Sequence, residues 1–147
     1  MPDLLALVDR ALTRARRHAA ILAGHNLDAD LARLSHLSAS RLRGVTGVHL
    51  AWSNRLQRER GTALPIDTDK ETRHTHPDLD TTLDPIPVRV PDDAASRAAL
   101  AHATLTRCLA IALTAAVHTG RYRWHGCFSC HDAISRAGWD LLAHEIR

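Results

Sequence analysis

Long apolar runs, cysteines, lysines and aromatic residues are all scarce in this chain of 147 residues. The closest approach to a long apolar run, Cys108 to Val117, has about half of the roughly 18 residues that a membrane span requires. The first residues, Met1 to Leu5, lack the basic start and the small-residue cleavage site of a secretory signal. We therefore expect a soluble, cytoplasmic protein with no membrane partner. Its three cysteines are expected to be reduced thiols, because an odd number without an export signal does not indicate a disulfide framework.

The short motifs of familiar enzyme classes are also absent. The chain has no H-E-x-x-H, no glycine-rich phosphate loop, no G-x-S-x-G and no pair of E-x-x-H motifs. His74, His76 and Asp78 place two histidines near a carboxylate, but metal hydrolases carry such residues at strand ends, and strand signals are scarce here. We interpret this segment as a solvated acidic loop. A binding protein is favoured over an enzyme, because no acid, base and nucleophile converge in the sequence.

Apolar residues recur every three or four positions in the first part of the chain, which predicts amphipathic helices. The first helix is expected over Pro2 to Ala23, followed by a glycine that ends it. A second helical region is expected over 26–61. Gly44 and Gly47 either end this helix or lie inside it at a cost of roughly 1 kcal/mol each relative to alanine. We favour one long helix with a weak middle, or two collinear pieces.

The most apolar helix is predicted over Ala94 to His118, with Asp92 or Asp93 as its N-cap. Arg107 is the only charged residue in the C-terminal half of this segment. Because almost every face is apolar or small, we expect the helix to be central and largely surrounded by its neighbours. A last helix is expected from about Cys130 to Glu145.

The helical period disappears in residues 62–91, which hold five of the six prolines. This segment also concentrates negative charge, since residues 61–95 have eight acids against three bases, whereas residues 1–60 have ten arginines against five acids. We interpret 62–91 as an extended or flexible strap. The fold class that we predict is all-α, a single domain over 1–147 built as a four- to five-helix bundle with one long Pro/Asp-rich crossover.

Arginine supplies the basic charge, because the chain has one lysine and a sequence pI of about 9.1. Arginines on the first two helices could line one side of the bundle and neutralise phosphates, and an aromatic segment near residue 122 adds groups that stack on bases. The residues assigned to this face are Arg10, Arg14, Arg17, Arg41, Arg43, Arg55, Arg58, Arg121, Arg123 and Trp124. The predicted partner is nucleic acid or an acidic protein, and the protein is expected to act within an oligomer or larger assembly. The alternative is a solvated face paired with the acidic strap.

The segment from Cys127 to His131 fits C-x-x-C-H. In a helical bundle this motif resembles the cytochrome c′ group of haem proteins, which implies thioether attachment at Cys127 and Cys130 and an axial iron ligand at His131. The same spacing could form part of a structural zinc site, with His125 or His131 as a third ligand. The candidates for a fourth ligand are Cys108, His118 and His144. A redox-active dithiol and two ordinary cysteines at a helix start are the other interpretations. Of the two cofactors, zinc is favoured over haem.

Overall fold

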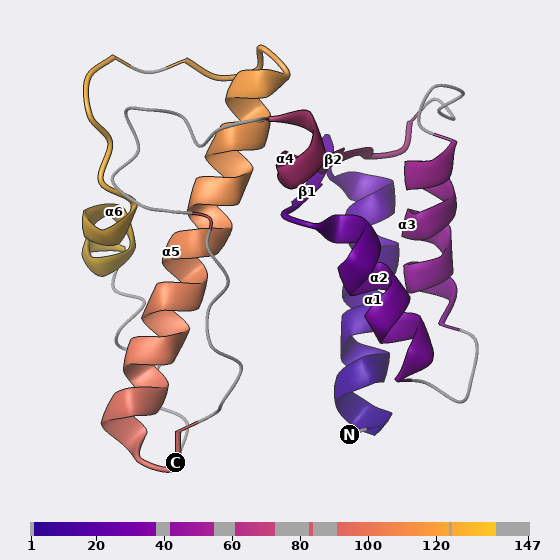
Figure 1. Cartoon of the computed structure of the whole chain (residues 1–147), viewed down its shortest axis with the longest axis horizontal. Helices are drawn as coiled ribbons and strands as arrows, with labels where there is room; N and C mark the ends of the chain where they lie inside the picture. Colours follow the sequence, from indigo (N-terminus) through magenta and orange to yellow (C-terminus); the bar gives the residue numbers. More distant parts are fainter. Residues whose placement is uncertain are drawn as a thin grey trace. The chain divides into compact units, whose positions relative to one another are not determined.

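The computed structural model describes residues 2–37, 42–54, 61–72, 83, 91–123 and 125–137. These residues form six helices and two short strands, so the protein is mostly helical, as the sequence predicts. The chain divides into two compact units, Met1–Arg73 and His74–Arg147. Figure 1 shows the elements of both. The first unit contains both strands, and the second contains helices α5 and α6 in its described part.

The first unit contains a small parallel sheet that the sequence analysis does not predict. Helix α1 (Pro2–His18) is followed by β1 (Ile21–Gly24), which pairs in parallel with β2 (Leu64–Asp67). The prediction that the first helix continues to Ala23 is therefore wrong. The reason is a long-range contact: the backbone N–H of Ala63 donates to the carbonyl of Arg16 at 2.8 Å, which takes the acceptor that a longer helix would use.

The remaining elements of the first unit pack around a small apolar core. Helices α2 (Leu27–His36) and α3 (Arg43–Ser53) are separate and pack together through Leu31 and Val48. The second helical region is therefore not one long helix or two collinear pieces, and both glycines lie inside α3. Packing explains the difference, because each helix buries its apolar stripe against the other. The cluster consists of Leu27, Leu31, Val45 and Val48, with Leu12, Leu22, Leu34 and Leu42 packed against it.

The predicted strap begins with regular secondary structure. Strand β2 continues directly into the short helix α4 (Thr68–Glu71), whose N-cap Asp67 accepts a hydrogen bond from the backbone N–H of Asp69. Asp67 is fully buried. The prediction of an extended or flexible strap is thus wrong for the helical residues 68–71, whereas residues 64–67 are extended but paired in a sheet. Residues 73–82 and 84–90 lie outside the described part of the chain.

The second unit is centred on α5 (Ala94–His118), and its predicted bounds are confirmed. The side chain of its N-cap Asp93 accepts a hydrogen bond from the backbone N–H of Ser96 at 2.7 Å. This bond, with a second from the Ser96 side chain, lowers the pKa of Asp93 below its ordinary value of 3.8. Local sequence signals were sufficient here, because both the cap and the helix stop lie next to the helix itself.

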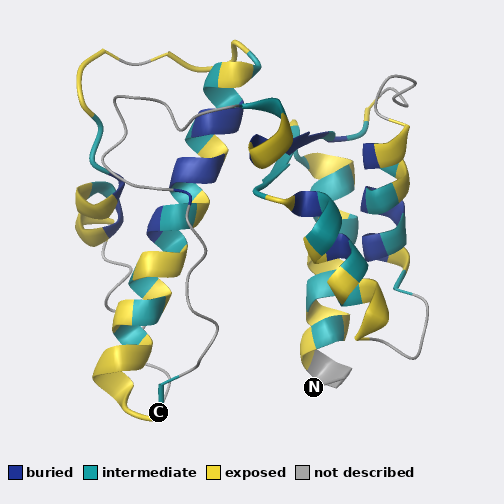
Figure 2. Ribbon diagram, viewed as in Figure 1, coloured by how far each residue is buried: buried dark blue, intermediate teal, exposed yellow. Residues whose placement is uncertain are grey.

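The expectation that α5 is largely surrounded by its neighbours is not confirmed. Figure 2 shows its buried positions in the C-terminal half and exposed positions in the N-terminal half. The buried residues are Thr106, Ala110, Ile111, Thr114 and Ala115. Arg107 bonds through Nε to the carbonyl of Leu83 at 3.1 Å. By length and a mean hydropathy of 1.5, α5 could also cross a membrane, a property that core helices of soluble proteins share.

Helix α6 (Cys130–Arg136) packs against α5. Its N-cap Ser129 accepts a hydrogen bond from the backbone N–H of Asp132, and Cys130 and Ile134 are buried. The predicted start at Cys130 is confirmed, whereas residues 138–147, which include the predicted end, lie outside the described part.

Candidate nucleic-acid interface

Helix α1 presents a row of arginines to solvent. Arg10, Arg14 and Arg17 are all exposed, and their spacing of four and three residues places them on one face of the helix. Arg43, at the first position of α3, is exposed as well. Among the described residues, no carboxylate forms an ion pair with any of these four arginines, so their charges are available to an external anion.

A pocket of about 300 Å³ lies between α1 and α3, inside the first unit. Three guanidinium groups line it, from Arg16 and Arg17 on α1 and from Arg43 on α3. Asp9 is the one acidic residue among the described lining residues, which therefore carry a net charge of +2. Thr13 and Gly44 complete the lining. We refer to this cavity as the arginine pocket.

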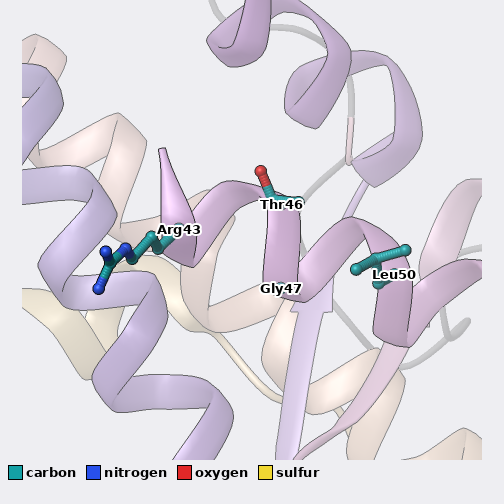
Figure 3. Close-up of a pocket in the computed structure, with 4 residues that line it drawn as sticks. All are labelled: Arg43, Thr46, Gly47 and Leu50. Carbon is teal, nitrogen blue, oxygen red and sulfur yellow. The ribbon is translucent and has the colours of Figure 1, made fainter. Parts of the chain in front are cut away.

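A second pocket, of about 490 Å³, shares Arg43 with the arginine pocket. Its other described lining residues are Thr46, Gly47 and Leu50, all on α3. Figure 3 shows Arg43 and Leu50 at opposite ends of this group, with Thr46 and Gly47 between them. Leu50 is 55% exposed. The two pockets together therefore offer cationic groups at one end and an apolar side chain at the other.

The geometry of the arginine pocket depends on a close approach of α1 and α3. A Cβ atom on Gly44 would lie 2.1 Å from the backbone oxygen of Asp9, so no side chain fits at this position. A Cβ atom on Gly47 would instead lie 2.9 Å from Nη1 of Arg16. The absence of a side chain at Gly47 thus lets the Arg16 guanidinium lie against α3.

Asp9 holds the N-terminus of α3 in place of a local N-cap. Its Oδ1 atom accepts hydrogen bonds from the backbone N–H groups of Gly44 at 2.7 Å and Val45 at 3.0 Å. The N-cap residue Leu42 has no side chain that can do this. Because a carboxylate already occupies the positive end of α3, a bound anion would have to be held by the arginines rather than by the helix amides.

The remaining residues of the predicted basic face are divided between the second unit and the undescribed ranges. Arg121 and Arg123 are exposed in the segment after α5. Arg41, Arg55, Arg58 and Trp124 lie outside the described residues. The sequence analysis did not include Arg16, which the structure brings into one pocket with Arg17 and Arg43.

The predicted metal ligands are not gathered into one group. His118, His125, Cys127 and His131 are exposed, whereas Cys130 is buried at the start of α6. His131 lies edge-on against His102 of α5, with 4.4 Å between the ring centroids. Within the described ranges, no three His, Cys, Asp or Glu residues are placed so that they could hold a metal ion. Zinc or haem at this segment stays a prediction.

Sequence reasoning missed a polar cluster at the carboxyl ends of β1 and β2. Asp67 Oδ1 accepts the backbone N–H groups of Asn26 at 2.9 Å and Asp69 at 3.1 Å, which ties the two strand ends together. Asn26 has a positive φ of 63°. The available signal was a pair of short apolar stretches that each end in polar residues, at His25 and at Asp67.

The same cluster contains a Thr–His–Asp chain that cannot act as a catalytic triad. The hydroxyl of Thr68 donates to the carbonyl of Gly24 at 3.1 Å, so its contact with His25 Nδ1 at 3.1 Å must be an acceptor contact. Thr68 is fully buried, and Asp69 lies 3.9 Å from His25 Nε2. A buried hydroxyl whose proton is already donated is no nucleophile. We interpret this Thr–His–Asp group as structural, because it connects residues at the ends of β1 and β2.

Acidic side chains predominate near this cluster, and one of them, Asp28, has an ion-pair partner. Asp28 Oδ2 lies 3.2 Å from Lys70 Nζ, and its Oδ1 lies 3.5 Å from His49 Nε2. The Lys70 ammonium also lies 5.7 Å from the ring centroid of Trp52.

Comparison with protein-family models, curated proteins and solved structures finds no match for the chain. Its function is therefore inferred from its own side chains and contacts.

Proposed function

We propose that this protein is a non-enzymatic binding module that engages the backbone of a nucleic acid through the arginines of α1 and α3. The observation that carries the proposal is the arginine pocket, in which Arg16, Arg17 and Arg43 face one cavity with a single acid among the described lining residues. That acid, Asp9, is already hydrogen-bonded to the α3 amides. Neither Arg17 nor Arg43 forms an ion pair with a described residue.

A nucleic-acid backbone is the partner that we favour for this surface, because its charges repeat along the strand. A guanidinium binds two phosphate oxygens with parallel hydrogen bonds, and its planar fork loses little freedom in doing so. The row of Arg10, Arg14 and Arg17 extends the positive charge beyond the pocket along α1. An extended polyanion can contact the row and the pocket together and release several counterions, which strengthens its binding at low salt. An acidic protein partner is the competing outcome of the binding test.

The proposal includes the arrangement of the whole chain. We infer a bundle of four or five helices with its Pro/Asp-rich crossover, working in the cytoplasm as part of a larger assembly. The exposed Arg121 and Arg123 of the second unit would add phosphate contacts in such a body. These contacts would be additional to the pocket and are not needed for it.

Binding of a fluorescently labelled single-stranded oligonucleotide to the full chain tests the proposal. With three phosphates neutralised, a slope of about −0.7 per phosphate predicts that affinity falls roughly 20-fold between about 50 and 200 mM salt. An acidic peptide of equal charge, measured in parallel, should bind more weakly. Affinity for the oligonucleotide that is unchanged between the two salt concentrations, or absent at both, would reject the proposal, and tighter binding of the peptide would favour the acidic protein partner.

A further inference from the structure

The second pocket, of about 490 Å³, lies along one face of α3. Its described lining residues have the i, i+3, i+4, i+7 spacing of residues that share a helix face. They are Arg43, Thr46, Gly47 and Leu50. Both ends of this face are exposed, with a guanidinium at one end and a leucine at the other (Figure 3). We refer to this hollow as the α3 pocket.

Leu50 is the feature of the α3 pocket that phosphate binding does not explain. Its side chain is 55% exposed, whereas Val45 and Val48 of the same helix are buried in the core. A single exposed leucine on a protein surface needs no explanation by itself. This leucine, however, lines a hollow that includes Arg43, a residue of the proposed phosphate-binding surface. Apolar surface of this kind is stabilised by apolar surface on a ligand and not by a charged phosphate.

The two ends of the α3 pocket are separated by a distance that one nucleotide can span. Arg43 and Leu50 are seven residues apart, so at about 1.5 Å per residue they are about 10 Å apart along the helix axis. A phosphate held at Arg43 would place its sugar over Gly47 and its base beside Leu50. The volume of the pocket is within the usual range for small-molecule sites, so a sugar and a base fit.

The described polar groups of the α3 pocket give a base little to read. The Thr46 hydroxyl donates to the carbonyl of Leu42 at 2.7 Å, so it has no proton left for a base. Gly47 has no side chain. Among the described lining residues, the apolar surface of Leu50 is therefore the contact that a base would make. Contact with the face of a base is tolerant of sequence, because every base has such a face.

We propose that the α3 pocket holds an unpaired base, with Leu50 against its face and Arg43 on the adjacent phosphate, so that the protein prefers a single strand to a duplex. This inference rests on the proposed function and makes it more specific, because it adds base contact to backbone contact. A duplex would first have to unpair and unstack a base, which costs free energy that a single strand does not lose.

Affinities for a single strand and for a duplex of the same sequence test the preference. A surface that recognised charge alone would bind the duplex at least as tightly, because a duplex has the higher density of phosphates. We expect the full chain to bind the single strand about tenfold more tightly, because the duplex must give up a base pair to fill the pocket. Equal affinity, or tighter binding of the duplex, would overturn the inference.

A single strand of abasic nucleotides separates base contact from phosphate contact, because it keeps every phosphate and lacks every base. The parent chain should bind the abasic strand about fivefold more weakly than the normal strand, and L50S should bind the two strands within about twofold of each other. Leu37 offers a matched control, because it is a leucine of α2's C-cap that is 62% exposed and is not among the described lining residues. L37S should keep the full preference for the normal strand.

Salt dependence supplies a readout that a merely structural effect would not reproduce. L50S should keep the salt slope of the parent chain, because it removes no phosphate contact. R43A should weaken binding of the normal and abasic strands alike and make both slopes shallower. R33A should change neither, since Arg33 is an exposed residue of α2 that lies 3.6 Å from Asp30 and is not among the described lining residues. A shallower slope in L50S would contradict its assignment to the base.

Failure of this inference can be told from failure of the proposed function. Equal affinity of the parent chain for normal and abasic strands, with the expected salt dependence, overturns base recognition and leaves backbone binding intact. Absence of binding by every strand at about 50 mM salt overturns both. Circular dichroism of L50S should match that of the parent chain, because the Leu50 side chain is more than half exposed.

Discussion

At the scale of single residues, the two glycines of α3 have different roles. Gly44 lets the backbone of α1 approach, whereas Gly47 makes room for the flexible end of Arg16. We predict that G44A destabilises the first unit by about 3 kcal/mol, because the new methyl would meet a backbone oxygen that cannot move alone. G47A should change stability by less than about 1 kcal/mol, since the arginine can shift and alanine favours the helix. Urea unfolding followed by circular dichroism compares them; equal effects would contradict the described approach of the helices.

Asp9 is the second residue with a specific structural role. Its carboxylate caps α3 from another helix, so D9A leaves the N–H groups of Gly44 and Val45 without their acceptor. We predict a loss of about 1 to 2 kcal/mol, the usual size of a lost N-cap with its charge at the helix end. D9N should lose less, because its amide oxygen can still accept. Asp30 offers a matched control: D30A removes only an exposed contact with Arg33 and should cost less than about 0.5 kcal/mol.

At the scale of elements, the cap of α5 makes its first turn sensitive to acid. Hydrogen bonds from Ser96 lower the pKa of Asp93, so the folded helix prefers the ionised carboxylate. The stabilisation is therefore fully present above the ordinary value of 3.8 and is lost as the pH falls through the lowered pKa. An NMR titration should give an inflection for the Asp93 carboxyl below 3.8, with faster amide exchange at Ser96 under more acidic conditions. In D93N this pH dependence should disappear, and an Asp93 inflection at or above 3.8 would contradict the cap.

The elements also show which parts of the fold a sequence can predict. The bounds of α5 follow from neighbouring residues, because Asp93 begins the helix and a glycine follows its end. Strand β1 has only four residues, and its Ile-Leu-Ala-Gly sequence reads equally well as the last turn of a helix. What makes it a strand is its pairing with β2, more than 40 residues away along the chain. No local pattern contains that pairing.

The candidate interface likewise has features that the sequence predicts and features that depend on long-range contacts. The spacing of Arg10, Arg14 and Arg17 predicted a shared helix face, and all three are exposed. The meeting of Arg16 and Arg17 with Arg43 depends on the contact between α1 and α3, which helical periodicity does not specify. The sequence analysis gave Asp9 no role. An unpaired acid opposite a Gly-x-x-Gly helix start is the signal that could have indicated its role as a cap.

At the scale of the whole molecule, charge separates regions with different roles. At the strand ends Asp28 is paired with Lys70, but the four acids Asp28, Asp67, Asp69 and Glu71 outnumber this one lysine, so the formal charge there is negative. Arg10, Arg14 and Arg17 of α1 and Arg43 of α3 form no ion pair with a described acid. A long-range attraction for polyanions would therefore originate on this face of the first unit. Salt dependence is the direct measure of that attraction.

The most direct test of this account compares the salt dependence of oligonucleotide binding in the parent chain, in R17A/R43A and in the control R33A. If Arg17 and Arg43 each neutralise one phosphate, the slope of log affinity against log salt should become shallower by about 1.4 in R17A/R43A. R33A should retain the slope of the parent chain. An R17A/R43A slope equal to that of the parent would contradict the account, because the phosphate contacts would then lie elsewhere on the protein.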